Sequence, residues 1–429
     1  MASSMDWTDT VRELVKEAAA SPEGLSGTRD ALYCLWLAIR RAPDPVRDMF
    51  RSIDEDWLAN EAARLDLASI FTDVPMAAGS TAESEALLRA LAVRVRVLEE
   101  LFLSMYDGAP LQTGADCVAR GGGTSAYIVP RPPKSRAAKT GDYFLRRGLR
   151  DCRIIQSRIG DFDVELIFPE DPRSRLRAIN ETEFVVGAGL FENLKLVLET
   201  KNERFLVSDA VSPNQLEVIE AHLAAATKRA CAAVVYPELT IGRTTLGEIS
   251  RRLSNGTWDV PHLSILVAGS MHAADGGRTY NVATVFDGYG QTVVQHRKLY
   301  RFSKGATLIE DIDLGTKLHV VVLEDAIFTI GICLDFCNLM ETPPYIELDV
   351  DFVVVPSYGT ETTMVGHVER STDVMKKLKC RTVVVQQFDE PVKPQPLGYV
   401  LARINENVPP LGDLATDLGW NILILYDVS

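Results

Sequence analysis

The strongest signal in the chain is the stretch Ala326-Ile327-Phe328-Thr329-Ile330-Gly331-Ile332-Cys333-Leu334-Asp335. Its apolar, β-branched first half is typical of a buried strand. The Gly-Ile-Cys that follows predicts a turn that presents a side chain to a cleft, so Cys333 is a candidate nucleophile. The competing interpretation is a packing residue, because free cysteine is among the most buried residue types.

Two other segments supply partners for such a nucleophile. The apolar run 232–239 ends in Pro237-Glu238, and a carboxylate beside a proline that cannot continue the strand ladder is held in place, which suits a general base. Segments 280–290 and 293–298 form a predicted hairpin that ends in Lys298. A fixed ammonium at that point stabilises a developing oxyanion and favours a nearby thiolate.

These segments share a pattern with a known family. The motifs Val235-Tyr236-Pro237-Glu238, Arg297-Lys298-Leu299, Gly331-Ile332-Cys333-Leu334-Asp335 and Val353-Val354-Val355-Pro356-Ser357 resemble, in this order, the Glu, Lys and Cys motifs of the nitrilase superfamily of carbon–nitrogen hydrolases. The resemblance covers 202–429, and 420–427 is similar to the family's closing strand. It implies an α/β fold, a four-layer αββα sandwich with the catalytic residues on loops at strand ends.

The resemblance also implies a mechanism. Glu238 takes the thiol proton, Cys333 attacks an amide or nitrile carbon, and Lys298 with the backbone N–H of Leu334 holds the negative charge of the tetrahedral intermediate. Water activated by the same carboxylate then hydrolyses the thioester. Another acceptor would make the enzyme a transferase.

Further site residues follow from the same resemblance. Many family members carry a second glutamate that orients the lysine, and Glu310 is the candidate here, with Asp311 and Asp313 as competitors and a solvated acidic loop as the alternative. Ser357 and Tyr358 occupy a position that lines the substrate pocket in the family; the alternative is an ordinary turn.

The chain departs from the family after Asp335. Family members often continue with an arginine, an aromatic residue and a Pro-Glu pair, whereas this chain continues with 336–340, Phe-Cys-Asn-Leu-Met. The missing arginine puts the substrate class in doubt. Cys337 is either a packing residue or a thiol close to the pocket, and packing is favoured.

Composition favours a cytoplasmic enzyme without a metal or another cofactor. His272, His296 and His367 lack the paired spacing of metal ligands. Seven cysteines in 429 residues, without CxxC spacing, fit a reducing compartment. The first residues lack the basic and apolar regions of a signal peptide, and no apolar run is long enough to span a membrane.

A net charge of −14 argues against binding to nucleic acid or anionic membranes.

One local exception to the acidic composition is 131–158, where nine Lys or Arg residues accompany two acids. The favoured interpretation is a solvated linker with a charged strand. The alternative is a docking surface for an acidic partner or a nucleic acid.

The N-terminal part differs from the rest. Apolar residues at three- and four-residue spacing predict helices at 7–20, 28–41, 45–65 and 82–106, hence a bundle over 1–106, with caps at Asp44 and Ser80-Thr81. Glycine and proline, including the triplet at 121–123, predict a linker over 107–140 rather than a phosphate loop. Strand-like segments make 141–200 a β-rich extension or an intermediate segment, which leaves 201–429 as the catalytic domain.

The sequence therefore predicts a cysteine-dependent, amidase-like hydrolase that is at least a homodimer, as the resemblance implies, and whose helical domain regulates the enzyme or recruits a protein partner. Two alternatives stay open: a relative that transfers the acyl group or produces ammonia, and a scaffold protein with an idle nucleophile. A hydrolase loses turnover on Cys333→Ala, whereas a scaffold keeps its function.

Overall fold

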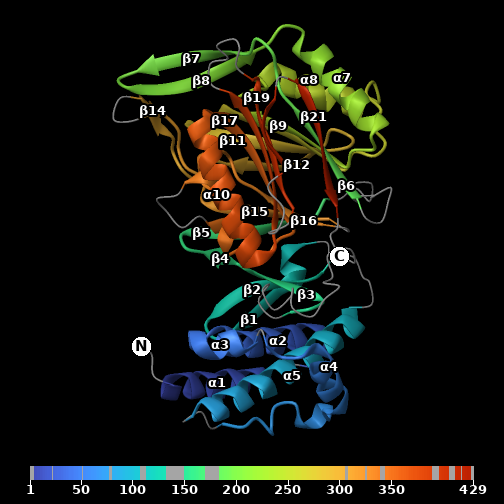
Figure 1. The fold of residues 1–429 in the computed structure, drawn as a ribbon, viewed down its shortest axis with the longest axis vertical. Coiled ribbons are helices and arrows are strands. Elements are labelled where there is room, and N and C mark those ends of the chain that lie inside the picture. The colour runs from blue at the N-terminus through green and yellow to red at the C-terminus, as the bar shows by residue number, and fades with distance from the viewer. Residues whose placement is uncertain are drawn as a thin grey trace. The chain divides into compact units, whose positions relative to one another are not determined.

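The computed structural model describes residues 4–21, 23–50, 52–76, 80–106, 113–131, 149–169, 183–304, 308–323, 326–338, 344–388, 396–404, 411–416 and 418–426. It divides into two compact units, an N-terminal unit over 1–158 and a sandwich unit over 159–428 (Figure 1).

Two mixed sheets form the sandwich unit. The six-stranded sheet has the order β12 (Thr292–Arg297), β11 (Arg278–Asp287), β10 (Ile265–Asp275), β9 (Ala233–Glu238), β6 (Glu183–Gly189) and β21 (Trp420–Tyr426). The eight-stranded sheet has the order β20 (Leu411–Thr416), β19 (Gly398–Arg403), β18 (Arg381–Phe388), β17 (Phe352–Gly359), β16 (Ile327–Ile330), β15 (Lys317–Val322), β5 (Phe162–Ile167) and β4 (Arg158–Ile159).

The side chains of these strands define four layers. Along β9, Val235 enters the core between the sheets, where strands of both sheets contribute, while Val234 and Tyr236 face a second core against α7 (Gln215–Lys228) and α8 (Arg243–Ser254). The other sheet is covered by α10 (Glu361–Leu378), which packs on β17, β18 and β19. Each fully buried aliphatic side chain contributes about 1.5–3 kcal/mol. The predicted αββα sandwich is confirmed (Figure 1).

Shorter elements complete this unit. A four-stranded sheet has the order β13 (Ser303–Lys304), β14 (Leu308–Glu310), β8 (Arg204–Val211) and β7 (Lys195–Lys201). A single helical turn, α9 (Leu334–Cys337), follows β16, and a 3-10 turn, η4, spans Pro344–Ile346. The predicted closing strand is β21, antiparallel to β6.

The N-terminal unit is built around one largely buried helix. Its helices are α1 (Ser4–Ala19), α2 (Leu25–Arg40), α3 (Asp44–Phe50), α4 (Glu55–Arg64) and α5 (Thr81–Tyr106), with 3-10 turns η1 (Leu67–Ser69) and η2 (Gly114–Cys117). Nearly every side chain of α2 is buried, because α1, α5 and a strand pack on it. The predicted helical domain is present, and its third helix divides where Asp54 caps α4.

The predicted linker over 107–140 contains a hairpin instead. Strands β1 (Val118–Gly121) and β2 (Thr124–Pro130) pair, and β3 (Cys152–Gln156) joins them. Gly122 and Gly123 connect the pair at φ +57° and +73°, as a two-residue turn of type I′ requires. A Cβ on Gly121 would lie 2.5 Å from the Cys34 sulfur of α2. The glycines therefore serve a turn and a close packing contact; 107–112 and 132–140 lie outside the described residues.

The predicted boundary at residue 201 is wrong as well. Strand β5 pairs with β15, and β6 lies between β9 and β21, so both belong to the sandwich, while β3 belongs to the N-terminal unit. The strands that pair with β5 and β6, namely β15, β9 and β21, are far from them in the sequence. Local alternation predicts the strands but not the sheet that each one joins.

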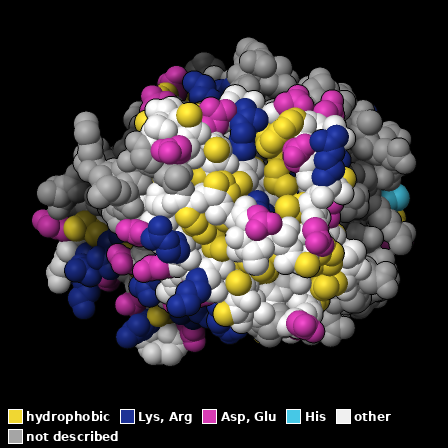
Figure 2. Space-filling view, turned by 90° about the horizontal axis from the view of Figure 1, so that it is seen from below, with side chains coloured by type: hydrophobic (Ala, Val, Ile, Leu, Met, Phe, Trp, Pro, Cys, Tyr) yellow, Lys and Arg dark blue, Asp and Glu magenta, His cyan; other side chains and the backbone are white. Residues whose placement is uncertain are grey.

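The described part of the basic stretch 131–158 contains two buried arginines and two exposed ones, Arg150 and Arg158. Arg131 and Arg153 are buried, at 2% and 0% exposed, and Arg150 lies within ion-pair distance of Glu55. Residues 132–148 lie outside the described residues. On the face drawn in Figure 2, charges of both signs alternate with hydrophobic side chains. Among the described residues, no helix is long and apolar enough to cross a membrane.

A β-bulge in β10 fixes the strand that carries Glu238. Gly269 has φ +62°, and a Cβ there would lie 2.0 Å from the carbonyl oxygen of Pro237. We expect Gly269→Ala to lower the free energy of unfolding by about 2–4 kcal/mol, since left-handed strain and overpacking add. Urea unfolding measures this loss.

The matched control is Gly247→Ala in α8, where a Cβ meets open space. Alanine favours a helix over glycine by up to about 1 kcal/mol, so this variant is at least as stable as the wild type. Equal unfolding midpoints for the two variants would contradict the role assigned to Gly269.

Candidate active site

Cys333 lies on the turn between β16 and α9, as the sequence predicts. Its backbone adopts φ +46°, ψ −104°, a conformation that costs of order 1–3 kcal/mol in a residue with a side chain and is found at active sites. The Cys333 N–H donates to the Pro356 carbonyl oxygen over 2.9 Å, which holds the turn against β17. The thiol is 3.6 Å from the carbonyl oxygen of Tyr358.

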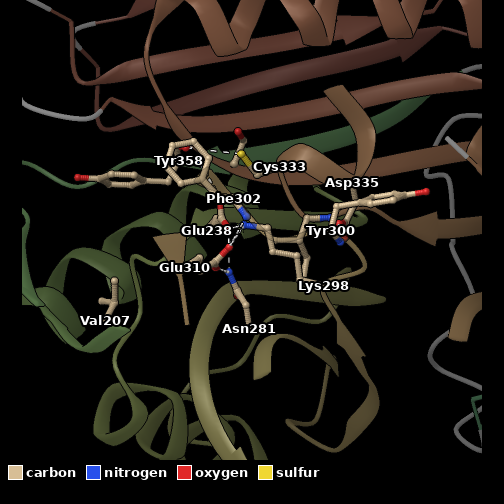
Figure 3. A network of polar contacts seen from close by, with 12 residues as sticks. Val207, Glu238, Asn281, Lys298, Tyr300, Phe302, Glu310, Cys333, Asp335 and Tyr358 are labelled. Atoms are coloured by element: carbon tan, nitrogen blue, oxygen red, sulfur yellow. Dashed lines mark hydrogen bonds and ion pairs between the residues drawn. The ribbon is translucent and has the colours of Figure 1, made fainter. Parts of the chain in front are cut away.

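The ammonium of Lys298 joins two carboxylates. Its Nζ atom donates to Glu238 Oε1 over 2.8 Å and to Glu310 Oε2 over 2.9 Å (Figure 3). All three side chains are at most 3% exposed. They come from the ends of β9, β12 and β14, so the fold brings together residues that are far apart in the sequence.

Of the three acids near residue 310, the structure brings Glu310 to the lysine. Glu310 Oε2 also accepts the Phe302 N–H over 3.0 Å. Asp311 instead forms a half-exposed ion pair with Arg204. The role of Glu310 as the second active-site glutamate stays a prediction.

Asn281 and His272 complete the network, and sequence reasoning assigned neither of them a role. Asn281 Nδ2 donates to Glu238 Oε1 over 2.8 Å and to Glu310 Oε1 over 2.9 Å. His272 Nδ1 accepts the Val207 N–H over 2.7 Å, so Nε2 carries the proton that bonds Glu310 Oε1 over 2.9 Å. The two residues are direct cross-strand partners in the β10–β11 hairpin. The pairing of His272 with Asn281 across the hairpin is the signal that would have placed both residues in the site.

Burial and charge set the protonation of this network. Burial lowers the pKa of Lys298, but the charges of Glu238 and Glu310 outweigh it and hold the pKa well above its usual range. Burial raises the pKa of Glu310, but Lys298 and His272 outweigh it, so the pKa lies well below its usual range. Lys298 and Glu310 therefore stay charged in the folded protein.

The nucleophile candidate has a second thiol beside it. A hydrogen bond with Cys337, burial and the charge of Glu238 raise the pKa of Cys333 well above its usual range. The same hydrogen bond lowers the pKa of Cys337, against the effect of burial. Cys333 is thus held as a thiol and needs a base to become a nucleophile. Cys337 is buried, as expected of a packing residue, and also lies close to Cys333.

Asp335 fastens the nucleophile turn to the lysine strand, and it was not among the predicted site residues. Its Oδ1 accepts the N–H groups of Leu299 and Tyr300 over 2.9 and 2.8 Å, and Oδ2 accepts that of Ile332 over 3.2 Å. The Asp335 carboxylate therefore holds both backbone segments of the site, the one next to Lys298 and the one next to Cys333.

The predicted substrate-binding residues have different surroundings. Leu334 begins α9, and among the described residues its N–H has no hydrogen-bond acceptor. Tyr358 is half-buried, and its N–H donates to Glu238 Oε2 over 3.2 Å. The hydroxyl of Ser357 is fully buried and bonds His367 and Gln386. Contact of any of the three with a substrate stays a prediction.

No protein-family model matches the chain, and no curated protein is similar to it in sequence. Solved structures are similar at low identity. Nit3 from Saccharomyces cerevisiae, described as a member of branch 10 of the nitrilase superfamily, is 14% identical over 57% of this chain and 90% of its own, with a TM-score of 0.40. An amidase from Nesterenkonia sp. is 14% identical over 58% and 92%, with a TM-score of 0.42.

A third similar structure is the glutamine-dependent NAD+ synthetase from Acinetobacter baumannii, which is 18% identical over 58% of this chain and 47% of its own, with a TM-score of 0.43. The αββα assignment itself rests on the layers and the strand order described above.

The depressed pKa of Glu310 makes stability depend on pH. A carboxylate whose pKa is lower in the folded than in the unfolded state stabilises the protein above the unfolded value, about 4.3, and loses this contribution as the pH falls toward the folded value. We expect Glu310→Gln to be less stable at pH 7 by on the order of 3 kcal/mol, with a shallower loss of stability below about pH 4.3. Urea unfolding across this range measures both.

Asp311→Asn is the control, because it removes a neighbouring carboxylate from a half-exposed ion pair. Its stability is expected to change by less than about 1 kcal/mol. If Glu310→Gln behaves like Asp311→Asn, the Lys298 network is not the stabilising feature that its geometry indicates.

Proposed function

We propose that the chain is a nitrilase-superfamily enzyme, a cysteine-dependent hydrolase of a non-peptide carbon–nitrogen bond, with amide-like substrates. One observation carries the proposal. A lysine held between two buried carboxylates lies beside a buried cysteine on a strained turn (Figure 3), at the ends of strands from the two packed sheets and the four-stranded sheet.

Glu238 is the proposed base. Its Oε1 atom is engaged by Lys298 and Asn281, while Oε2 accepts only the long contact from the Tyr358 N–H among the described residues. The carbonyl of the same Tyr358 lies against the Cys333 thiol. Backbone atoms of one residue thus touch both base and nucleophile, which supports proton transfer from Cys333 to Glu238 Oε2.

The oxyanion has two proposed donors. Lys298 uses two of its three N–H groups on carboxylates, which leaves the third for a substrate oxygen. The Leu334 N–H lies next in the chain to the nucleophile and is the second donor. Attack by the Cys333 thiolate on the carbonyl carbon forms the C–S bond and places the negative charge on that oxygen.

Collapse of the intermediate completes the first half of the reaction. The C–N bond breaks, the leaving amine or ammonia takes the proton that Glu238 received, and a thioester on Cys333 remains. Water then attacks the thioester carbon while Glu238 accepts its proton, which releases the acid and restores the thiol. An amine in place of that water gives the acyltransferase alternative.

Intact-mass spectrometry with a panel of small aliphatic amides tests the proposal. The wild type is expected to hydrolyse at least one amide and to show one acyl adduct, and Cys333→Ala is expected to lose both. Glu238→Gln should lower kcat about 10²–10⁴-fold, as expected for loss of a general base.

Cys231→Ala is the matched control, because it removes a thiol buried in the core under α7 and α8. It should keep turnover and adduct. Absence of both adduct and selective alkylation at Cys333 would favour the scaffold alternative, and an adduct that only an amine resolves would favour the transferase.

The surroundings of the enzyme are part of the proposal. All seven cysteines are free and buried, which supports a reducing, cytoplasmic compartment. We propose that the N-terminal unit regulates the enzyme or recruits a protein partner. The support for this separate role is that the unit has a hydrophobic core of its own and that the candidate active-site residues all belong to 159–428. We also propose, from the family resemblance, that the chain forms at least a homodimer.

Deletion of 1–158 tests the separate role of the N-terminal unit. We expect the remaining sandwich unit to keep kcat/KM for the small amide, because each unit has its own core. Turnover and light scattering of both chains are the measurements. Loss of turnover in a folded sandwich unit would mean that the N-terminal unit contributes to the site.

A further inference from the structure

Three soft-metal ligands converge at the nucleophile. One ligand atom each from Cys333, Cys337 and His367 lies within 4.8 Å of the other two. The three side chains are buried, at 4%, 8% and 0% exposed. They come from the turn after β16, from α9 and from α10, and the proposed hydrolysis uses only Cys333.

The histidine of this cluster has one ring nitrogen that no nitrogen or oxygen atom of the described residues bonds. Gln386 Nε2 donates to Thr360 O over 2.9 Å, which directs the amide oxygen of Gln386 to Ser357. The Ser357 hydroxyl donates to that oxygen over 3.2 Å and therefore accepts from His367 Nε2–H over 2.9 Å. Nδ1 consequently has a lone pair; no nitrogen or oxygen atom of the described residues bonds this buried atom, and the neighbour with which His367 interacts is the Cys337 thiol.

This arrangement matches that of a zinc ligand. Metal-binding histidines usually donate their second ring N–H to a fixed acceptor, as Nε2–H does here to Ser357. Zinc bonds of about 2.3 Å to sulfur place two sulfurs about 3.8 Å apart in a tetrahedral site, so the thiols would need to approach by about 1 Å at most.

The charge around the cluster also accommodates a cation. The charge of Lys298 acts on both thiols of the cluster, and this ammonium forms ion pairs with both Glu238 and Glu310. The positive charge of the ammonium is thus offset by the negative charge of its carboxylate partners. Two thiolates then offset a divalent ion in a buried environment, where an unpaired charge is costly.

We propose that Cys333 Sγ, Cys337 Sγ and His367 Nδ1 bind one Zn²⁺, with water in the fourth position. The thiol protons pass to solvent when the metal binds. Because the metal uses the sulfur of Cys333, metal binding and nucleophilic attack exclude each other, so the site is inhibitory. The metal site goes beyond the proposed function and does not depend on catalysis by Cys333; only its inhibitory effect rests on the proposed function.

Cobalt titration tests the site on the full-length protein, with Co²⁺ as the spectroscopic substitute for zinc. The protein is kept anaerobic with a phosphine reductant, so that no disulfide between Cys333 and Cys337 forms. We expect one Co²⁺ per chain, with the charge-transfer absorption of thiolate-bound cobalt and the visible bands of a tetrahedral ion. Zn²⁺ should displace it.

Variants assign the ligands. Cys337→Ala and His367→Gln should lose the thiolate-bound tetrahedral spectrum, whereas Cys231→Ala, which removes a buried thiol of another core, should keep it. Ser357→Ala removes the hydroxyl that holds the imidazole and should weaken binding about 10–100-fold. Circular dichroism checks the fold of each variant, and Cys337→Ser is a second substitution at the same position.

A measurement on the wild type alone avoids variants that fail to fold. Zn²⁺ should protect Cys333 from iodoacetamide, and a chelator should restore alkylation. The proposal is overturned if the wild type shows no thiolate-bound cobalt, if Cys337→Ala keeps it, or if Zn²⁺ gives no protection. The amide assay contains no added metal, so its failure and the failure of this proposal are separate results.

Discussion

Lys298 is charged at a position where its side chain is 2% exposed, and Glu238 and Glu310 supply the opposite charges. Removing an ammonium and two carboxylates from water is costly, and good geometry with further hydrogen bonds must offset that cost. Asn281 and His272 provide these bonds from β11 and β10. The charged network therefore forms only if five strands hold their relative positions, because its residues lie on or directly after β9, β10, β11, β12 and β14.

The position of Cys333 depends on how the two large sheets pack on each other. Cys333 follows a strand of the eight-stranded sheet, whereas Lys298 follows a strand of the six-stranded sheet. Asp335 connects the two through backbone N–H groups on both sides. A site assembled in this way forms only when the two sheets pack together, so its geometry depends on the core between them.

Much of the fold is encoded locally. The helices of the N-terminal unit follow from their apolar periodicity, and the strands carrying Glu238 and Cys333 follow from short apolar runs with a break at the end. The segment 107–200 is where local reasoning failed. The glycine triplet 121–123 would look the same in the sequence of a linker as in that of a type I′ turn. Its packing against α2, which distinguishes the turn from a linker, is visible only in the structure.

By itself, the sequence determined the candidate nucleophile, base and lysine, because a polar residue at the end of a buried strand is visible from neighbouring residues alone. Only the tertiary structure decided that Glu310 rather than Asp311 meets the lysine, that Asn281 and His272 support both carboxylates, and that His367 joins two thiols. The physical reason is that hydrogen bonds and charge pairs act over a few ångströms, and strand pairing brings together residues that are distant in the chain.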